Sequence, residues 1–94
     1  MSESVEPYKF ILFVVGNGRN SQQAQENLNN ICAEHLRAWR CEIVIVDVQQ
    51  DFQMALDYNI LVTPTLVVQG PRGVSTIIGN LSEVDSVLMA LGPY

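Results

Sequence analysis

The stretch that decides the fold is ILVTPTLVV, residues 60–68. Its aliphatic and β-branched side chains indicate a β-strand, yet Pro64 stands in the middle of it. Proline has no backbone N–H to donate to a neighbouring strand, so it is not expected inside a central strand. The sequence therefore predicts that the strand proper covers about residues 65–69 and that Pro64 begins it.

On the N-terminal side, two apolar segments flank a helical pattern. The segments YKFILFVV (8–15) and CEIVIVDV (41–48) predict two buried strands. Residues 21–38 between them follow a helical period. Asn20 or Ser21 is expected to cap this helix, with Gln23 as a reciprocal cap. Strand, helix and strand in this order predict parallel pairing. The apolar stripe of the helix is Ala24, Leu28, Ile31, Cys32 and His35.

On the C-terminal side, the pattern predicts a short helix over 51–58, with Phe52, Ala55 and Leu56 facing inward. The turn at 70–73 and a return strand at 74–78 predict an antiparallel hairpin. Ser82 and Asp85 form a capping pattern for a last helix. The apolar stripe of that helix is Val84, Val87, Leu88 and Leu91.

The predicted order β-α-β-α-β-β-α is the arrangement of the thioredoxin fold, an α/β fold with a mixed sheet. In that fold a proline, often cis, begins the third strand beside the N-terminal end of the first helix. Thr63-Pro64-Thr65 matches this element, so the sequence predicts a cis bond before Pro64.

Composition limits the classes of function. The 94 residues predict a single domain over 1–94. A net charge of -5, with only five Lys plus Arg, argues against binding to nucleic acid. The apolar runs are shorter than the roughly 20 residues of a membrane span, and the acidic N-terminus is unlike a signal peptide. A cytoplasmic location without membrane association is expected.

The sequence predicts no catalytic residue, no metal and no cofactor. Thiol exchange in a thioredoxin-like fold needs a cysteine at the start of the first helix, where residues 18–21 have none. Cys32 and Cys41 have neither redox-motif nor zinc-pair spacing and are interpreted as buried, reduced structural residues. The GNGRNS segment lacks the last glycine of a dinucleotide-binding loop, so a turn with Gly16 or Gly18 at positive φ is expected.

Several short motifs, in this order and at these spacings, resemble the KaiB family of clock proteins over about residues 8–91. These are VVGN, then NS at 20–21, LNNI at 28–31, VDV at 46–48, TPTL at 63–66 and IIGNLS at 77–82. The resemblance implies a non-enzymatic protein that binds the ATPase ring of KaiC. It also implies links to KaiA and to a histidine kinase with a KaiB-like sensor domain, and the ability to form homo-oligomers.

The resemblance further implies metamorphic behaviour, since KaiB proteins switch between a thioredoxin-like monomer and a tetramer whose C-terminal half has a different secondary structure. That second fold is the alternative to the thioredoxin-like prediction. This chain departs from the family in QGPRG, which has one proline, Pro71, and in LMALG before Tyr94. Gly70 and Gly73 frame a plain hairpin turn and Ala90 favours helix, so the chain is predicted to stay thioredoxin-like.

By similarity, a partner surface is expected from the end of the first helix to the start of the second strand. Trp39 would be its apolar anchor, with a charged rim. Two alternatives stay open, a sensor or adaptor module for a histidine kinase and a thiol-dependent redox protein. Whether the role is circadian or a stress response is also open. The candidate binding residues are Asn17, Arg19, Arg37, Trp39, Arg40 and Glu42.

Overall fold

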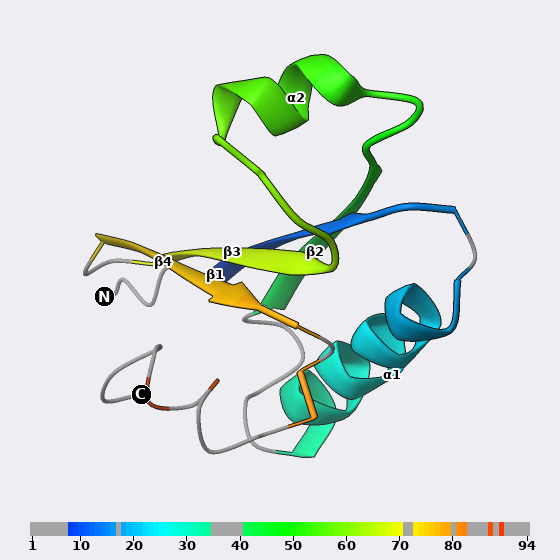
Figure 1. The fold of residues 1–94 in the computed structure, drawn as a ribbon. Coiled ribbons are helices and arrows are strands. Elements are labelled where there is room, and N and C mark those ends of the chain that lie inside the picture. The colour runs from blue at the N-terminus through cyan, green and yellow to red at the C-terminus, as the bar shows by residue number, and fades with distance from the viewer. Residues whose placement is uncertain are drawn as a thin grey trace.

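A computed structural model describes residues 8–16, 18–34, 41–70, 73–79, 81–82, 87 and 89. The elements follow the predicted order (Figure 1). They are β1 (Tyr8–Val14), α1 (Arg19–Glu34), β2 (Cys41–Asp47), α2 (Phe52–Asp57), β3 (Thr65–Gly70) and β4 (Gly73–Ile78). Val87 and Met89 have helical backbone, and the rest of the predicted last helix lies outside the described residues.

The four strands form one mixed sheet in the order β2-β1-β3-β4. β1 pairs in parallel with β2, and Tyr8 lies opposite Cys41. β1 also pairs antiparallel with β3, with Phe13 opposite Thr65. β3 and β4 form the predicted antiparallel hairpin. The sheet is therefore mixed, as the sequence predicted.

Side chains alternate between two cores, because successive residues of a strand point to opposite faces of the sheet. Phe10 and Leu12 of β1 belong to the core on the face covered by α1, which also contains Val87. Ile11 and Phe13 belong to the smaller core on the face covered by α2. Figure 1 shows α1 and α2 on opposite sides of the sheet. β1 is thus buried on both faces, as predicted.

Helix α1 confirms the predicted stripe but begins earlier than expected. Ala24, Leu28, Ile31 and Cys32 are buried, whereas His35 lies outside the described residues. The helix begins at Arg19, and Gln22 N–H donates to the Gly18 carbonyl at 3.0 Å. Asn20 and Ser21 therefore lie within the first turn, so the predicted caps at these positions were wrong.

The structure corrects two further predictions. β2 was expected to be buried, but it lies at the edge of the described sheet and only Val46 in it is buried. Helix α2 was expected to turn Phe52, Ala55 and Leu56 inward. Only Ala55 is buried, whereas Phe52 is 65% exposed and Leu56 is 60% exposed. Met54 and Tyr58 pack against the core in their place.

The peptide bond between Thr63 and Pro64 is cis, as predicted. Gly16 has φ 54°, which confirms the predicted turn after β1. Within the part of the chain that the structure describes, no helix has the length and apolar character to cross a membrane.

Candidate functional site: an apolar pocket beside helix α2

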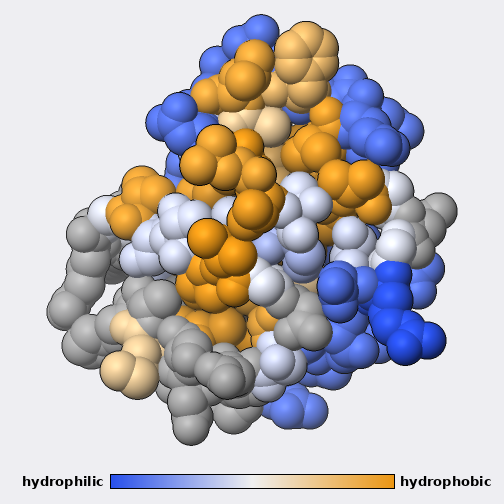
Figure 2. Space-filling model, viewed as in Figure 1, coloured by the Kyte–Doolittle hydropathy of each residue, from blue (hydrophilic) through white to orange (hydrophobic). Residues whose placement is uncertain are grey.

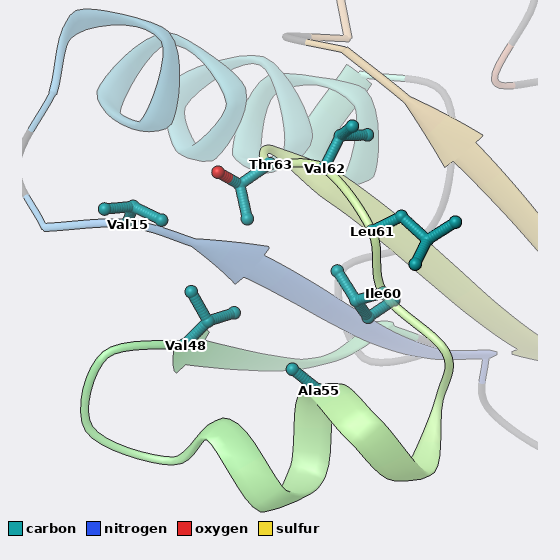
Figure 3. A pocket seen from close by; sticks show the side chains of 7 residues that line it. All are labelled: Val15, Val48, Ala55, Ile60, Leu61, Val62 and Thr63. Carbon is teal, nitrogen blue, oxygen red and sulfur yellow. The ribbon is translucent and has the colours of Figure 1, made fainter.

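A shallow pocket of about 190 Å³ lies where the C-terminal ends of β1 and β2 meet α2 and the segment before Pro64 (Figure 3). Four segments of the chain contribute to it, so it exists only in the folded protein. Its lining residues are Val15, Val48, Ala55, Ile60, Leu61, Val62 and Thr63.

Backbone hydrogen bonds fix the helix side of the pocket. Ile60 N–H donates to the Ala55 carbonyl at 2.8 Å, and Asn59 N–H donates to the Leu56 carbonyl at 3.1 Å. Asn59 has φ 57°, a left-handed conformation that asparagine tolerates better than most residues. The chain therefore turns sharply at the end of α2 and returns along the pocket as residues 60–63.

Two contacts hold α2 against the sheet through one side chain. The Tyr58 hydroxyl accepts a hydrogen bond from Gln69 Nε2 at 3.1 Å, and the Tyr58 ring packs on Phe13 with a centroid distance of 5.6 Å. Aromatic pairs at this separation are favourable. Tyr58 thus anchors the C-terminal end of α2 on β1 and β3.

Two hydrogen bonds hold the segment that leads to Pro64. The Thr65 hydroxyl donates to the Val62 carbonyl at 2.7 Å. Gly79 N–H donates to the Pro64 carbonyl at 3.0 Å, which joins the start of β3 to the end of β4. Together these bonds hold residues 62–65 as a preformed wall of the pocket.

Around the pocket, large apolar side chains face solvent. Leu61 is 92% exposed and Val62 is 48% exposed, and Phe52 and Leu56 of α2 are exposed as well. We call these four residues the α2 patch. Figure 2 shows apolar side chains gathered over α2, the 60–63 segment and the hairpin strands. Large exposed apolar patches are typical of surfaces that bind another macromolecule.

The pocket suits one apolar side chain rather than a cofactor. Small-molecule sites are usually about 300–1,000 Å³, larger than this pocket. Thr63 supplies the one side-chain polar group of the lining, and no lining residue is titratable. The described residues also contain no group of three or more His, Cys, Asp or Glu arranged to hold a metal ion.

The charged residues along α2 are acidic. Asp51 caps the helix by accepting from Met54 N–H at 3.3 Å, and Asp57 accepts from Gln53 Nε2 at 3.0 Å. Asp47 ends β2 and accepts from Gln49 N–H at 2.9 Å. Three carboxylates next to an apolar surface make a negative rim, so a basic partner surface would complement it.

The structure describes only two residues of the predicted partner surface. Arg19 is exposed at the first residue of α1, and Glu42 is exposed on β2. These two residues lie on different elements, and neither lines the pocket. The predicted residues that lie outside the described part of the chain are Asn17, Arg37, Trp39 and Arg40.

Cys41 lies at the far end of the sheet from Pro64, and Cys32 lies near the C-terminal end of α1, away from the start of that helix. Cys41 pairs with Tyr8 at the start of β1, whereas Thr65, next to Pro64, pairs with Phe13. Five residues of strand separate these positions, about 16 Å. Cys32 is buried as expected, but Cys41 is only half-buried. Neither thiol is placed for the exchange chemistry of a thioredoxin-like site.

Sequence reasoning missed the α2 patch because it took Phe52 and Leu56 as core residues. The sequence did contain a sign that Phe52 and Leu56 are exposed. Polar residues surround both of them, namely Asp51, Gln53 and Asp57, and the helix is only six residues long. So short a helix has room for few inward positions, and Ala55 takes one of them. Leu61 and Val62 carried no such signal, since they resemble the start of the following strand.

Comparison with known proteins gives the family. The KaiB domain model matches residues 11–93. The chain is 40% identical over 80 residues to the circadian clock protein KaiB3 of Synechocystis sp., covering 85% of this chain and 78% of that protein. It is 37% identical over 91 residues to the circadian clock oscillator protein KaiB of Cyanothece sp., covering 97% and 86% of the two chains.

Solved structures agree on the fold. The N-terminal domain of SasA from Synechococcus elongatus superposes with a TM-score of 0.77 at 23% identity, covering 95% of this chain and 85% of that one. Mitochondrial thioredoxin 3 from Saccharomyces cerevisiae superposes with a TM-score of 0.73 at 16% identity, covering 94% and 80%. The fold is thioredoxin-like, and the match of the domain model across most of the sequence shows that this chain belongs to the KaiB family.

Proposed function

We propose that this chain is a non-enzymatic clock regulator that binds a KaiC-type ATPase ring through the α2 patch. The observation that carries the proposal is the exposed apolar surface around a preformed pocket of about 190 Å³. Family membership supports a clock role, because the similar proteins of Synechocystis and Cyanothece are circadian clock proteins. A KaiA-like protein is a further candidate partner on the same grounds.

The geometry supports binding by a central apolar anchor. Interface energy concentrates in a few side chains that enter well-packed pockets, while the rim contributes mainly to specificity and association rate. A partner side chain that enters the pocket would contact Ala55 and Ile60, and Leu61 would close over it from the 60–63 wall. The acidic rim then favours a partner with Lys or Arg around its anchor.

The test is co-elution of the full chain with a KaiC-type ring from the same cell, with and without ATP. Leu61→Asp places a charge on the α2 patch at a residue that is almost fully exposed. Binding should therefore fall about tenfold or more while the unfolding midpoint stays unchanged. Asn29→Asp is the matched control, because it adds the same charge at an exposed position of α1, on the other face of the sheet.

The same binding experiment distinguishes two candidate interfaces, the α2 patch and the predicted 37–42 surface. If Leu61→Asp binds normally and Trp39→Ala does not, the interface is the predicted 37–42 surface and the α2 patch is excluded.

Raising the salt from about 0.05 to about 0.5 M should weaken wild-type binding, because salt screens the acidic rim. Absence of binding in every nucleotide state would reject a KaiC-type partner altogether.

A second candidate is a sensor or adaptor role for a histidine kinase. The observation in its favour is the likeness to the N-terminal domain of SasA, since this fold also occurs there as one part of a longer protein. Pull-down with a histidine kinase from the same cell, repeated with Leu61→Asp, distinguishes this role from ring binding.

A further inference from the structure

Strand β4 forms one edge of the described sheet and lacks the features that usually keep an edge strand from pairing with another chain. Natural edge strands carry charged side chains, a proline or a bulge that hinders such pairing. The strand at the other edge, β2, carries Glu42 and Asp47. In contrast, β4 has the sequence GVSTII, without charge or proline, and its register with β3 runs without a bulge.

Alternate residues of β4 direct their backbone groups away from β3. Gly79 N–H donates to the Pro64 carbonyl at 3.0 Å, so the bonds between β4 and β3 fall at every second residue back along the strand from Gly79. The N–H and C=O groups of Val74, Thr76 and Ile78 therefore point away from the sheet, along its plane. No other residue of the described part of the chain bonds to these groups.

The side chains of the same three residues form an exposed strip on the face of the sheet where α2 lies. Thr76 lies opposite Val67, whose side chain belongs to the core beneath α2, so Val74, Thr76 and Ile78 share that face. Val74 is 64% exposed and Ile78 is 70% exposed. An edge with outward backbone groups and exposed apolar side chains can add a further strand, since both the hydrogen bonds and the apolar contacts are then satisfied.

We propose that β4 pairs antiparallel with β4 of a second copy of this chain, so that the two sheets join into one. A two-fold axis at Thr76 places Thr76 opposite Thr76 of the partner subunit and Val74 opposite Ile78 of the partner subunit. This register gives the outward N–H and C=O groups of all three residues a backbone partner across the axis. It also brings Val74 and the partner's Ile78 together on one face as a β-branched cross-strand pair.

Charge favours a second copy at β4 over a second copy at the other edge. The chain has a net charge of -5, so two copies repel each other except where they meet through uncharged segments. Pairing through β2 would bring the carboxylates of Glu42 and Asp47 into one interface, whereas no like charges meet across an axis through β4.

The dimer is expected to be weak and to leave the α2 patch accessible. Residues 74–78 span only about 17 Å, and a contact of this length buries less than the roughly 1,200 Å² of stable interfaces. We therefore expect a Kd between about 10 μM and about 1 mM. The axis is perpendicular to the sheet, so both α2 patches lie on the same face of the joined sheet. The pairing does not depend on the proposed ring binding.

The test is sedimentation velocity of the full chain from about 10 μM to about 1 mM under reducing conditions, combined with amide hydrogen exchange at both ends of that range. The expected result is a monomer that becomes a dimer as the concentration rises. The amides of Val74, Thr76 and Ile78 should then exchange about twofold or more slowly, because only the dimer bonds them. A monomer at every concentration, or slower exchange in β2 instead of β4, would overturn the proposal.

Two variants locate the interface. Thr76→Lys places two ammonium groups opposite each other at the axis, at an exposed residue, and should raise the Kd about fivefold or more. Asn29→Lys is the matched control, because it adds the same charge at an exposed position of α1 and should not weaken the dimer. A dimer that survives Thr76→Lys would overturn the proposal, and its loss in Leu61→Asp would then assign the contact to the α2 patch. The exchange experiment uses wild type alone, so it stands even where a variant folds poorly.

Discussion

At Cys32, burial couples the charge state of one side chain to the stability of the fold. The thiol is 4% exposed in the core between α1 and the sheet, and this burial is the largest cause of its raised pKa. In the unfolded chain the thiol has a pKa near its usual value of about 8.5. The folded and unfolded states therefore bind different numbers of protons above that pH.

We predict that stability falls in alkaline solution because of this thiol. Below about pH 8.5 both states keep the proton, and Cys32 adds no pH dependence. Above that pH the unfolded chain releases the proton while the folded chain keeps it. The free energy of unfolding then drops by up to about 1.4 kcal/mol per pH unit. Urea unfolding under reducing conditions, from about pH 7 to about pH 10.5, measures this slope.

Cys32→Ala provides the comparison, since it removes the titrating group and leaves the other ionisable residues in place. Its stability should decline less steeply than that of wild type above about pH 8.5, whatever its absolute stability. Equal slopes for the two proteins would mean that the Cys32 thiol ionises in the folded chain as easily as in the unfolded chain.

At the scale of elements, the α2 patch depends on how the 60–63 segment is held between α2 and β3. Thr65 is buried at the first residue of β3, and its hydroxyl reaches back to the Val62 carbonyl. With the bond from Gly79 N–H to the Pro64 carbonyl, it holds the wall of the pocket against the sheet. A rigid wall favours binding because less conformational entropy is lost when a partner docks.

We predict that Thr65→Val weakens this wall while nearly preserving side-chain shape. Loss of the hydrogen bond should cost about 0.5–1.5 kcal/mol of unfolding free energy. Amide hydrogen exchange in residues 60–63 should speed up, and binding of the KaiC-type ring should weaken. Thr76→Val is the matched control on the exposed face of β4 and should leave the unfolding free energy, the exchange of residues 60–63 and ring binding unchanged. Unchanged exchange in Thr65→Val would show that the segment is held by other contacts.

At the scale of the whole molecule, the described residues form one thioredoxin-like arrangement. β3 and β4 pair along their whole length, beginning with Thr65 opposite Ile78. Leu66 and Val68 of β3 are buried in the same core as Leu28 of α1. The C-terminal half therefore shares its core with the N-terminal half across the central strand β1.

We predict that the full chain keeps this fold as one population in solution, although proteins of the family are expected to switch folds. Two packings of one sequence can coexist only where they differ by a few kcal/mol, and the paired hairpin and shared core favour the thioredoxin-like one. A ¹⁵N–¹H correlation spectrum should show one set of cross-peaks, with strand shifts across residues 65–70 and 73–78. A second set with helical shifts in these residues would contradict the prediction, and light scattering would show whether it belongs to an oligomer.

The sequence by itself determined the order of the elements, the buried stripe of α1, the hairpin and the cis bond before Pro64. The elements, the stripe and the hairpin depend on local patterns of periodicity and turn residues. The cis bond follows from the thioredoxin fold that this order of elements indicates. Only the tertiary structure decided that β2 lies at an edge, that Phe52 and Leu56 face solvent, and that four segments meet around a pocket. Each of these depends on which strands are neighbours and which face a helix covers, and such long-range contacts leave no periodic trace in the chain.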